Sequence, residues 1–169
     1  MQRLADNLAL ILITAWVGGM WAIGYLAAPT LFYSLDDRQL AGMLAGKMFA
    51  WVAYLGLFSA FYLLIHRLAR FGTLALKQAF FWTVFVMLLL TLAGHFGIQP
   101  MLAQLKLQAL PADVMQSVFA DRFRTWHGVA SIAYLLQSLL GVMLVLRAYF
   151  SRPVARQVMI PRTRCNIAR

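Results

Sequence analysis

Hydrophobic residues along this chain fall into four long blocks separated by shorter polar stretches. The blocks cover approximately residues 7–33, 40–65, 76–99 and 126–150. Each holds about twenty or more mostly apolar residues, the length that a helix needs to cross a hydrocarbon core about 30 Å thick. None of the blocks alternates with the period of two that membrane-spanning strands require. The pattern therefore predicts an all-α integral membrane protein built as a four-helix bundle.

The connection between the third and fourth blocks is the only long one. Residues 100–125 place Leu and Met at helical spacing, with Lys106 and glutamines on the other face. This pattern predicts an interfacial helix at the membrane surface, or helical extensions of the two flanking spans. Pro100 begins the connection, and Pro29 lies near the end of the first block, where the missing backbone donor predicts a kink.

Small and polar residues at helical spacing mark the expected contact faces, because helices in lipid associate through close packing and interhelical hydrogen bonds. These residues are Thr14, Gly18, Trp21 and Tyr25 in the first block, Gly42, Gly46, Ala53, Gly56 and Ala60 in the second, and His127, Ser131, Tyr134, Ser138 and Gly141 in the fourth. We therefore expect Gly46→Leu to destabilise the bundle more than Leu44→Ala does.

Charge is distributed unequally between the two ends of the predicted spans. The chain carries 15 Lys and Arg against 5 Asp and Glu, for a net charge of +10. Ten of the basic residues lie on the side that holds both termini and the loop 66–77, and five lie on the other side. The positive-inside rule then places both termini in the cytoplasm. We predict one four-span domain, residues 1–150, and a basic cytoplasmic tail, residues 151–169, that contacts anionic lipid.

The composition also limits the function. Of the residues, 63% are hydrophobic and only 12% are charged. A strongly basic soluble protein suggests nucleic-acid binding, but here the charges flank apolar blocks and serve membrane topology, so no nucleic-acid partner is expected. There is no Glu and no Asp within a span, which argues against a proton-driven transporter built on a buried carboxylate. No nucleophile–base motif or phosphate loop is present, which favours a protein that is not an enzyme.

Two histidines are the candidate cofactor ligands. His95 lies near the outer end of the third span and His127 near the outer end of the fourth, at a similar predicted depth. Two neutral imidazoles that face each other can ligate haem iron or a soft metal ion. The same pair can equally serve as hydrogen-bonded packing residues or gate a solute. Both alternatives remain open.

Several short motifs resemble one known family. They are "WVGG", "APTLFYSL", "AGKMFAWVAYL", "HFGIQPMLAQL" and "FRTWHGVAS". Together they resemble the transmembrane protein 205 family over roughly residues 8–146, although Ala50 stands where that family has a proline. The most specific pieces are the "APxxF" end of the first span and the entry to the fourth, with Phe123, His127 and Gly128. The resemblance implies a small multi-helix membrane protein of no settled activity, with many bacterial members known only as domains of unknown function.

The first span alone is more faintly similar to another group. The stretch "AWVGGMWAIGYLAAPTLF" resembles membrane proteins of the copper-resistance and haem-dependent protoporphyrinogen-oxidase type. Those oxidases carry a histidine about two turns before the matching tryptophan, whereas the corresponding place here, near Ala9, is apolar. Any haem in this chain would therefore have to rely on His95 and His127.

These observations lead to one principal expectation and one alternative. We expect a bundle in the bacterial inner membrane that handles a solute or cation, or supports another membrane system, in contact with lipid and as a candidate homo-oligomer. No cofactor is required by this hypothesis. The alternative is a redox or metal protein whose haem or metal ion is held by His95 and His127.

Overall fold

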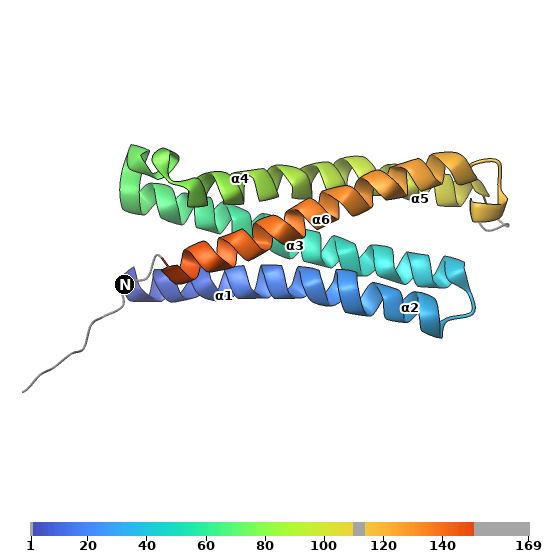
Figure 1. Cartoon of the computed structure of the whole chain (residues 1–169), viewed down its shortest axis with the longest axis horizontal. Coiled ribbons are helices and arrows are strands. Elements are labelled where there is room, and N and C mark those ends of the chain that lie inside the picture. Colours follow the sequence, from blue (N-terminus) through green and yellow to red (C-terminus); the bar gives the residue numbers. More distant parts are fainter. Residues whose placement is uncertain (1, 110–113, 151–169) are drawn as a thin grey trace, which may run out of the picture.

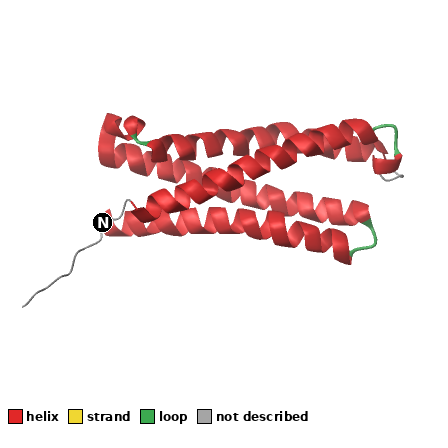
Figure 2. Ribbon diagram, viewed as in Figure 1, coloured by secondary structure: helices red, strands yellow, loops and turns green. Residues whose placement is uncertain are grey.

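The computed structural model describes residues 2–109 and 114–150, and within these ranges every regular element is helical (Figures 1 and 2). The elements are α1 (Gln2–Trp21), η1 (Ala22–Ala27), α2 (Ala28–Ser34), α3 (Arg38–Phe71), η2 (Gly72–Lys77), α4 (Ala79–Leu92), η3 (Ala93–Ile98), α5 (Gln99–Ala109), η4 (Val114–Gln116) and α6 (Ala120–Phe150). The basic tail 151–169 and its predicted lipid contact lie outside the described residues.

Four of the resulting rods are long and apolar enough to cross a membrane. They run over Arg3–Ser34, Arg38–Lys77, Ala79–Ala109 and Ala120–Phe150. Consecutive rods are antiparallel, and α6 crosses the bundle diagonally (Figure 1). The prediction of an all-helical chain with four candidate membrane spans is thus confirmed.

The connection between the third and fourth spans extends both of them. After η3, α5 continues the direction of α4, and α6 begins before the fourth apolar block (Figure 1). Leu105, Ala109 and Val114 form a small buried cluster against Phe119, Phe123 and Trp126. Of the two sequence-based alternatives, helical extensions are observed, rather than a separate interfacial helix.

Two of the spans contain a π-helical segment in front of a proline. η1 ends two residues before Pro29, and η3 ends two residues before Pro100. A proline donates no hydrogen bond to the carbonyl four residues earlier, and its ring needs room there. A π-helical turn, which bonds residues five apart, provides such a local widening. The break expected at Pro29 therefore takes the form of a π segment, and Pro100 repeats it at the same offset.

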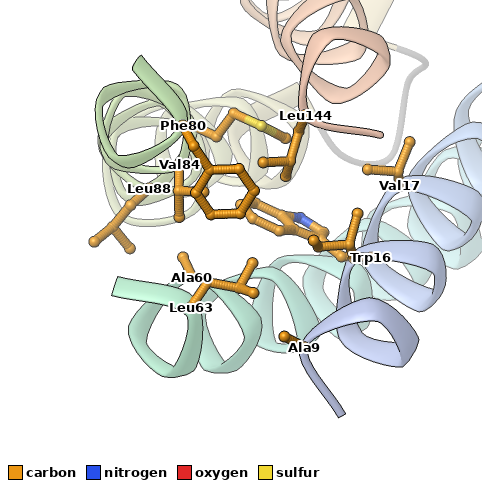
Figure 3. Close-up of a cluster of buried hydrophobic side chains, with 11 residues drawn as sticks. Ala9, Trp16, Val17, Ala60, Leu63, Phe80, Val84, Leu88 and Leu144 are labelled. Atoms are coloured by element: carbon orange, nitrogen blue, oxygen red, sulfur yellow. The ribbon is translucent and has the colours of Figure 1, made fainter. Parts of the chain in front are cut away.

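The main hydrophobic core lies between all four spans, at the end of the bundle opposite α2 and α5. Trp16 of α1 is 1% exposed and packs in a cluster with Ala60, Leu63, Val84 and Leu144 (Figure 3). Its indole lies so close to α3 that a Cβ atom at Gly56 would overlap it, 2.9 Å from Cε2. Because Gly56 has no side chain, the Trp16 indole of α1 can pack directly against the backbone of α3.

The contact face predicted for the first span is wrong at three of its four residues, since only Tyr25 hydrogen-bonds to another span. Thr14, Gly18 and Trp21 are exposed. The buried face instead holds larger apolar residues, namely Leu12, Ile13, Trp16, Val17 and Met20. In a span that is apolar all round, Met and Trp can fill the interior while small residues face lipid, so residue size alone does not identify the inward face.

Only some of the glycines expected at close helix contacts are found there, and the larger loss expected for Gly46→Leu than for Leu44→Ala has no support in the open surroundings of Gly46. A Cβ atom at Gly18, Gly46 or Gly128 would meet no other atom within 4 Å. At Gly42 it would lie 3.2 Å from the Lys106 Nζ atom and 3.7 Å from the Phe32 ring. The closest helix approaches occur at glycines beneath aromatic or branched side chains: Gly56 under Trp16 and Gly141 against Val17, both on the predicted contact faces, and Gly24 under Tyr134.

Candidate functional site

A cavity of about 1500 Å³ lies between the four spans at the end formed by α2 and α5. Figure 1 shows α2 and α3 well separated from α5 and α6 at this end. Most of the wall is apolar or aromatic; examples are Met20, Pro29, Phe32, Phe49, Leu102 and Phe123. A large, mainly apolar hollow with a few convergent polar groups is the usual form of a small-molecule binding site.

A buried hydrogen bond at the floor of the cavity joins α4 to α6. The Gln137 side-chain amide donates to the Thr91 hydroxyl over 2.7 Å, and that hydroxyl donates to the Met87 carbonyl over 2.8 Å. The Gln137 and Thr91 side chains are buried, and both residues line the cavity. This hydrogen-bonded pair fixes the contact between the third and fourth spans at the floor of the cavity.

Tyrosines on the first and fourth spans form a second wall. The Tyr25 hydroxyl donates to the Ser138 hydroxyl over 3.0 Å, and the Tyr134 hydroxyl donates to the Met20 carbonyl. The Tyr134 ring also meets Phe49 edge to face, with centroids 5.4 Å apart. The predicted polar stripe of the fourth span is therefore in contact with the first span at Tyr134 and Ser138, whereas His127 and Ser131 are exposed.

His95 lies on η3 and lines the cavity at mid-depth. Its ring meets Tyr54 and Phe96 edge to face, with centroids 4.7 and 4.8 Å apart. Its Nδ1 atom is buried and has no hydrogen-bond partner among the described residues. Because this atom has almost no accessible surface, a molecule in the cavity does not reach it in this arrangement.

His127 lies at the mouth of the same cavity, near the start of α6. It is exposed, and its ring stacks on Phe123, with centroids 5.8 Å apart and planes inclined by 9°. Its backbone carbonyl accepts a hydrogen bond from the Ser131 hydroxyl over 2.9 Å. Phe123, His127 and Ser131 therefore all border the mouth, whereas Gly128 is not among the lining residues.

The register of α6 against the third span separates the two histidines in depth. The Gln137 side chain reaches Thr91, and the helices are antiparallel. His95 lies four residues from this level and His127 lies ten, so their Cα positions differ by about 9 Å along the bundle axis. By this estimate, His127 lies nearer the mouth of the cavity than His95 does.

This separation bears on the cofactor hypothesis. Among the described residues, no group of three or more His, Cys, Asp or Glu side chains is placed to hold a metal ion. One ion ligated by two imidazoles needs nitrogen atoms about 2 Å from it on each side. A haem or metal site shared by His95 and His127 therefore stays a prediction.

The rim of the cavity is cationic. Arg38, Lys47 and Lys106 line it, and Asp37 supplies the only carboxylate among the described lining residues. Asp37 caps α3, because its Oδ1 atom accepts from the Gln39 and Leu40 backbone N–H groups over 2.8 and 3.1 Å. None of the three cations forms an ion pair within the described part of the chain.

Lys106 is the most enclosed of the three cations. Its ammonium group donates to the Gly42 carbonyl over 3.2 Å and lies 5.8 Å from the centroid of the Phe123 ring. It thereby bridges α5 and α3 across the mouth. From its sequence neighbours alone, Lys106 is expected only on a polar helix face. Its approach to Gly42 depends on how α5 continues α4 beyond Pro100, which no local pattern specifies.

One family model matches the chain over more than half of its length. It is described as a domain of unknown function (DUF4149), and the match covers residues 11–111. The matched part includes most of the first three rods, with His95 and Lys106. No curated protein and no solved structure matches the chain.

Proposed function

This chain belongs to the family of the domain of unknown function DUF4149, and we propose that it binds an anionic amphiphile in the cavity between its four spans. The observation that carries this proposal is the combination of a cavity of about 1500 Å³ with an apolar wall and a rim of Arg38, Lys47 and Lys106. An apolar chain suits the wall, and an anionic head group suits the rim.

The position of the rim relative to the bilayer supports this choice of ligand. On α3, Lys47 and Arg67 are separated by 20 residues, or about 30 Å, which equals the thickness of a hydrocarbon core. If these two residues mark its boundaries, Lys106 lies at head-group level and the Thr91–Gln137 floor lies within the hydrocarbon. An amphiphile would then keep its head at the depth that it has in the surrounding lipid.

Binding of radiolabelled oleate and oleyl alcohol to the purified protein in detergent tests this function. We expect the wild type to prefer oleate, and Lys106→Gln to weaken oleate binding about fivefold, since a contact between a cation and a head group contributes about 1 kcal/mol. Oleyl alcohol binding should change little. Arg124→Gln is the matched control, because Arg124 is exposed at the same end and does not line the cavity. Equal affinity for both ligands in the wild type would refute the preference for an anion.

We also propose that both termini lie in the cytoplasm of a bacterial cell and that the cavity opens on the opposite side of the inner membrane. The support is the ten-to-five excess of basic residues at the end that holds both termini. Green fluorescent protein fused after residue 169 should fluoresce, and alkaline phosphatase inserted between Ala109 and Val114 should be active. An active phosphatase at the C-terminus would reverse this orientation.

A further inference from the structure

A second hollow, of about 300 Å³, lies at the opposite end of the bundle. Its lining residues are Arg67, Phe71, Gln78, Ala79, Phe80 and Arg147. They come from the last turns of α3, the start of α4 and the last turn of α6, so the hollow is formed by three spans that are distant in sequence. It shares no lining residue with the large cavity.

Two half-buried arginines give this hollow its chemistry. Arg67 is held by aromatic rings, because its guanidinium carbon lies 4.2 Å from the centroid of Phe80 and 5.2 Å from that of Phe71. Such packing fixes the planar group while leaving its N–H donors at the edge free to bind. Arg147 enters from α6 and is also half-buried.

No carboxylate in the described structure forms an ion pair with either arginine, and the charge of Asp6 acts on Arg67 only from a longer distance. Asp6 is the only acidic side chain placed at this end, and it is paired with Arg70 and, over 3.3 Å, with the His66 Nε2 atom. Neither Arg67 nor Arg147 forms an ion pair within the described residues. Half-buried arginines without an acidic partner favour an anion supplied from outside the chain.

The start of α4 adds further donors to the same hollow. No side chain caps this helix, and Ala79 and Phe80, its first two residues, both line the hollow. Their backbone N–H groups have no carbonyl partner earlier in the helix, and the helix dipole places partial positive charge there. These donors supplement the two guanidinium groups.

We infer that Arg67 and Arg147 form a binding site for a phosphate group. Arginine binds phosphate through paired, parallel N–H donors, which suits two guanidinium groups at one hollow. The hollow lies about 30 Å along α3 from Lys47, at the other boundary of the proposed hydrocarbon core. Both a phospholipid head group and a soluble phosphate ester can supply the required chemistry at this depth.

Native mass spectrometry of the detergent-purified protein tests this site. Titration with dioleoylphosphatidylglycerol and with dioleoylglycerol, which has the same chains and no phosphate, isolates the phosphate contribution. We expect the wild type to retain the phospholipid in preference to dioleoylglycerol. Arg147→Gln and Arg67→Gln should each weaken phospholipid binding at least fivefold. Lys77→Gln is the matched control, because Lys77 lies at the same end, is exposed and does not line the hollow.

Further arms identify the source of the phosphate and guard against misfolding. If inorganic phosphate raises the unfolding temperature of the wild type but not of Arg147→Gln, the site accepts a soluble phosphate. If only the phospholipid raises the unfolding temperature of the wild type, the ligand is a lipid head group. Arg147→Gln serves as the primary variant because Arg67 also packs on Phe80. The inference would be overturned if both arginine variants bound the phospholipid as strongly as the wild type or Lys77→Gln does.

Discussion

Gly56→Ala should lower the thermal unfolding temperature of the detergent-purified protein sharply, whereas Gly46→Ala should leave it nearly unchanged or raise it slightly. The new methyl group at position 56 would overlap the indole of Trp16, whose Cε2 atom would be 2.9 Å away. Trp16 is fully buried in the main core and cannot move without disturbing its neighbours (Figure 3). Overpacking of this kind costs about 1–3 kcal/mol. At position 46 the methyl group meets no atom within 4 Å.

The two substitutions form a matched pair, because they make the same chemical change in the same helix. Alanine is also the better helix former by about 0.5–1 kcal/mol, so the helical propensity opposes the expected loss at position 56. Gly56→Ala should lower the unfolding temperature less in a Trp16→Phe background than in the wild-type background, because the smaller ring leaves room for the methyl group. Equal losses at positions 46 and 56 would contradict the close approach of α1 and α3.

The number and type of spans could be predicted from the sequence because they depend on local properties. Four apolar blocks of sufficient length require four helices in lipid, whatever their packing. The inward face of the first span could not be predicted in the same way. Both faces of that helix are apolar, so hydrophobic periodicity carries little information there, and the small-residue pattern at Gly18 pointed to the wrong face.

The candidate site was only partly predictable, because it depends on how the helices diverge. His95 and His127 were correctly placed toward the same end of the bundle, and both line the cavity. Their difference in depth follows from the register set by the Thr91–Gln137 hydrogen bond, which joins residues 46 positions apart in the chain. No local pattern specifies such a pairing. In the sequence, the clearest indication of a buried polar contact is Gln137, a single amide within an apolar block.

Gly46→Trp should abolish ligand binding in the large cavity while the protein remains folded. Gly46 lines the cavity, and open space lies above its Cα atom, so an indole can enter the hollow without displacing the helix backbone. It would then occupy volume that the apolar chain of the proposed ligand needs. We expect oleate affinity to fall at least tenfold, equivalent to about 1.4 kcal/mol or more. The unfolding temperature should stay close to that of the wild type, since no existing contact is lost.

Gly18→Trp provides the control for this substitution. Gly18 is exposed and does not line the cavity, and a Cβ atom there would meet no atom within 4 Å, so an indole at this position should face lipid. This variant should bind oleate as the wild type does.

The sensitivity to chain length is a further test, because a partly filled cavity should reject oleate more strongly than an eight-carbon carboxylate with the same head group. If Gly46→Trp is folded and binds oleate with unchanged affinity, the ligand does not occupy this cavity. If Gly18→Trp loses binding to the same extent, the effect of the indole is not specific to the cavity wall.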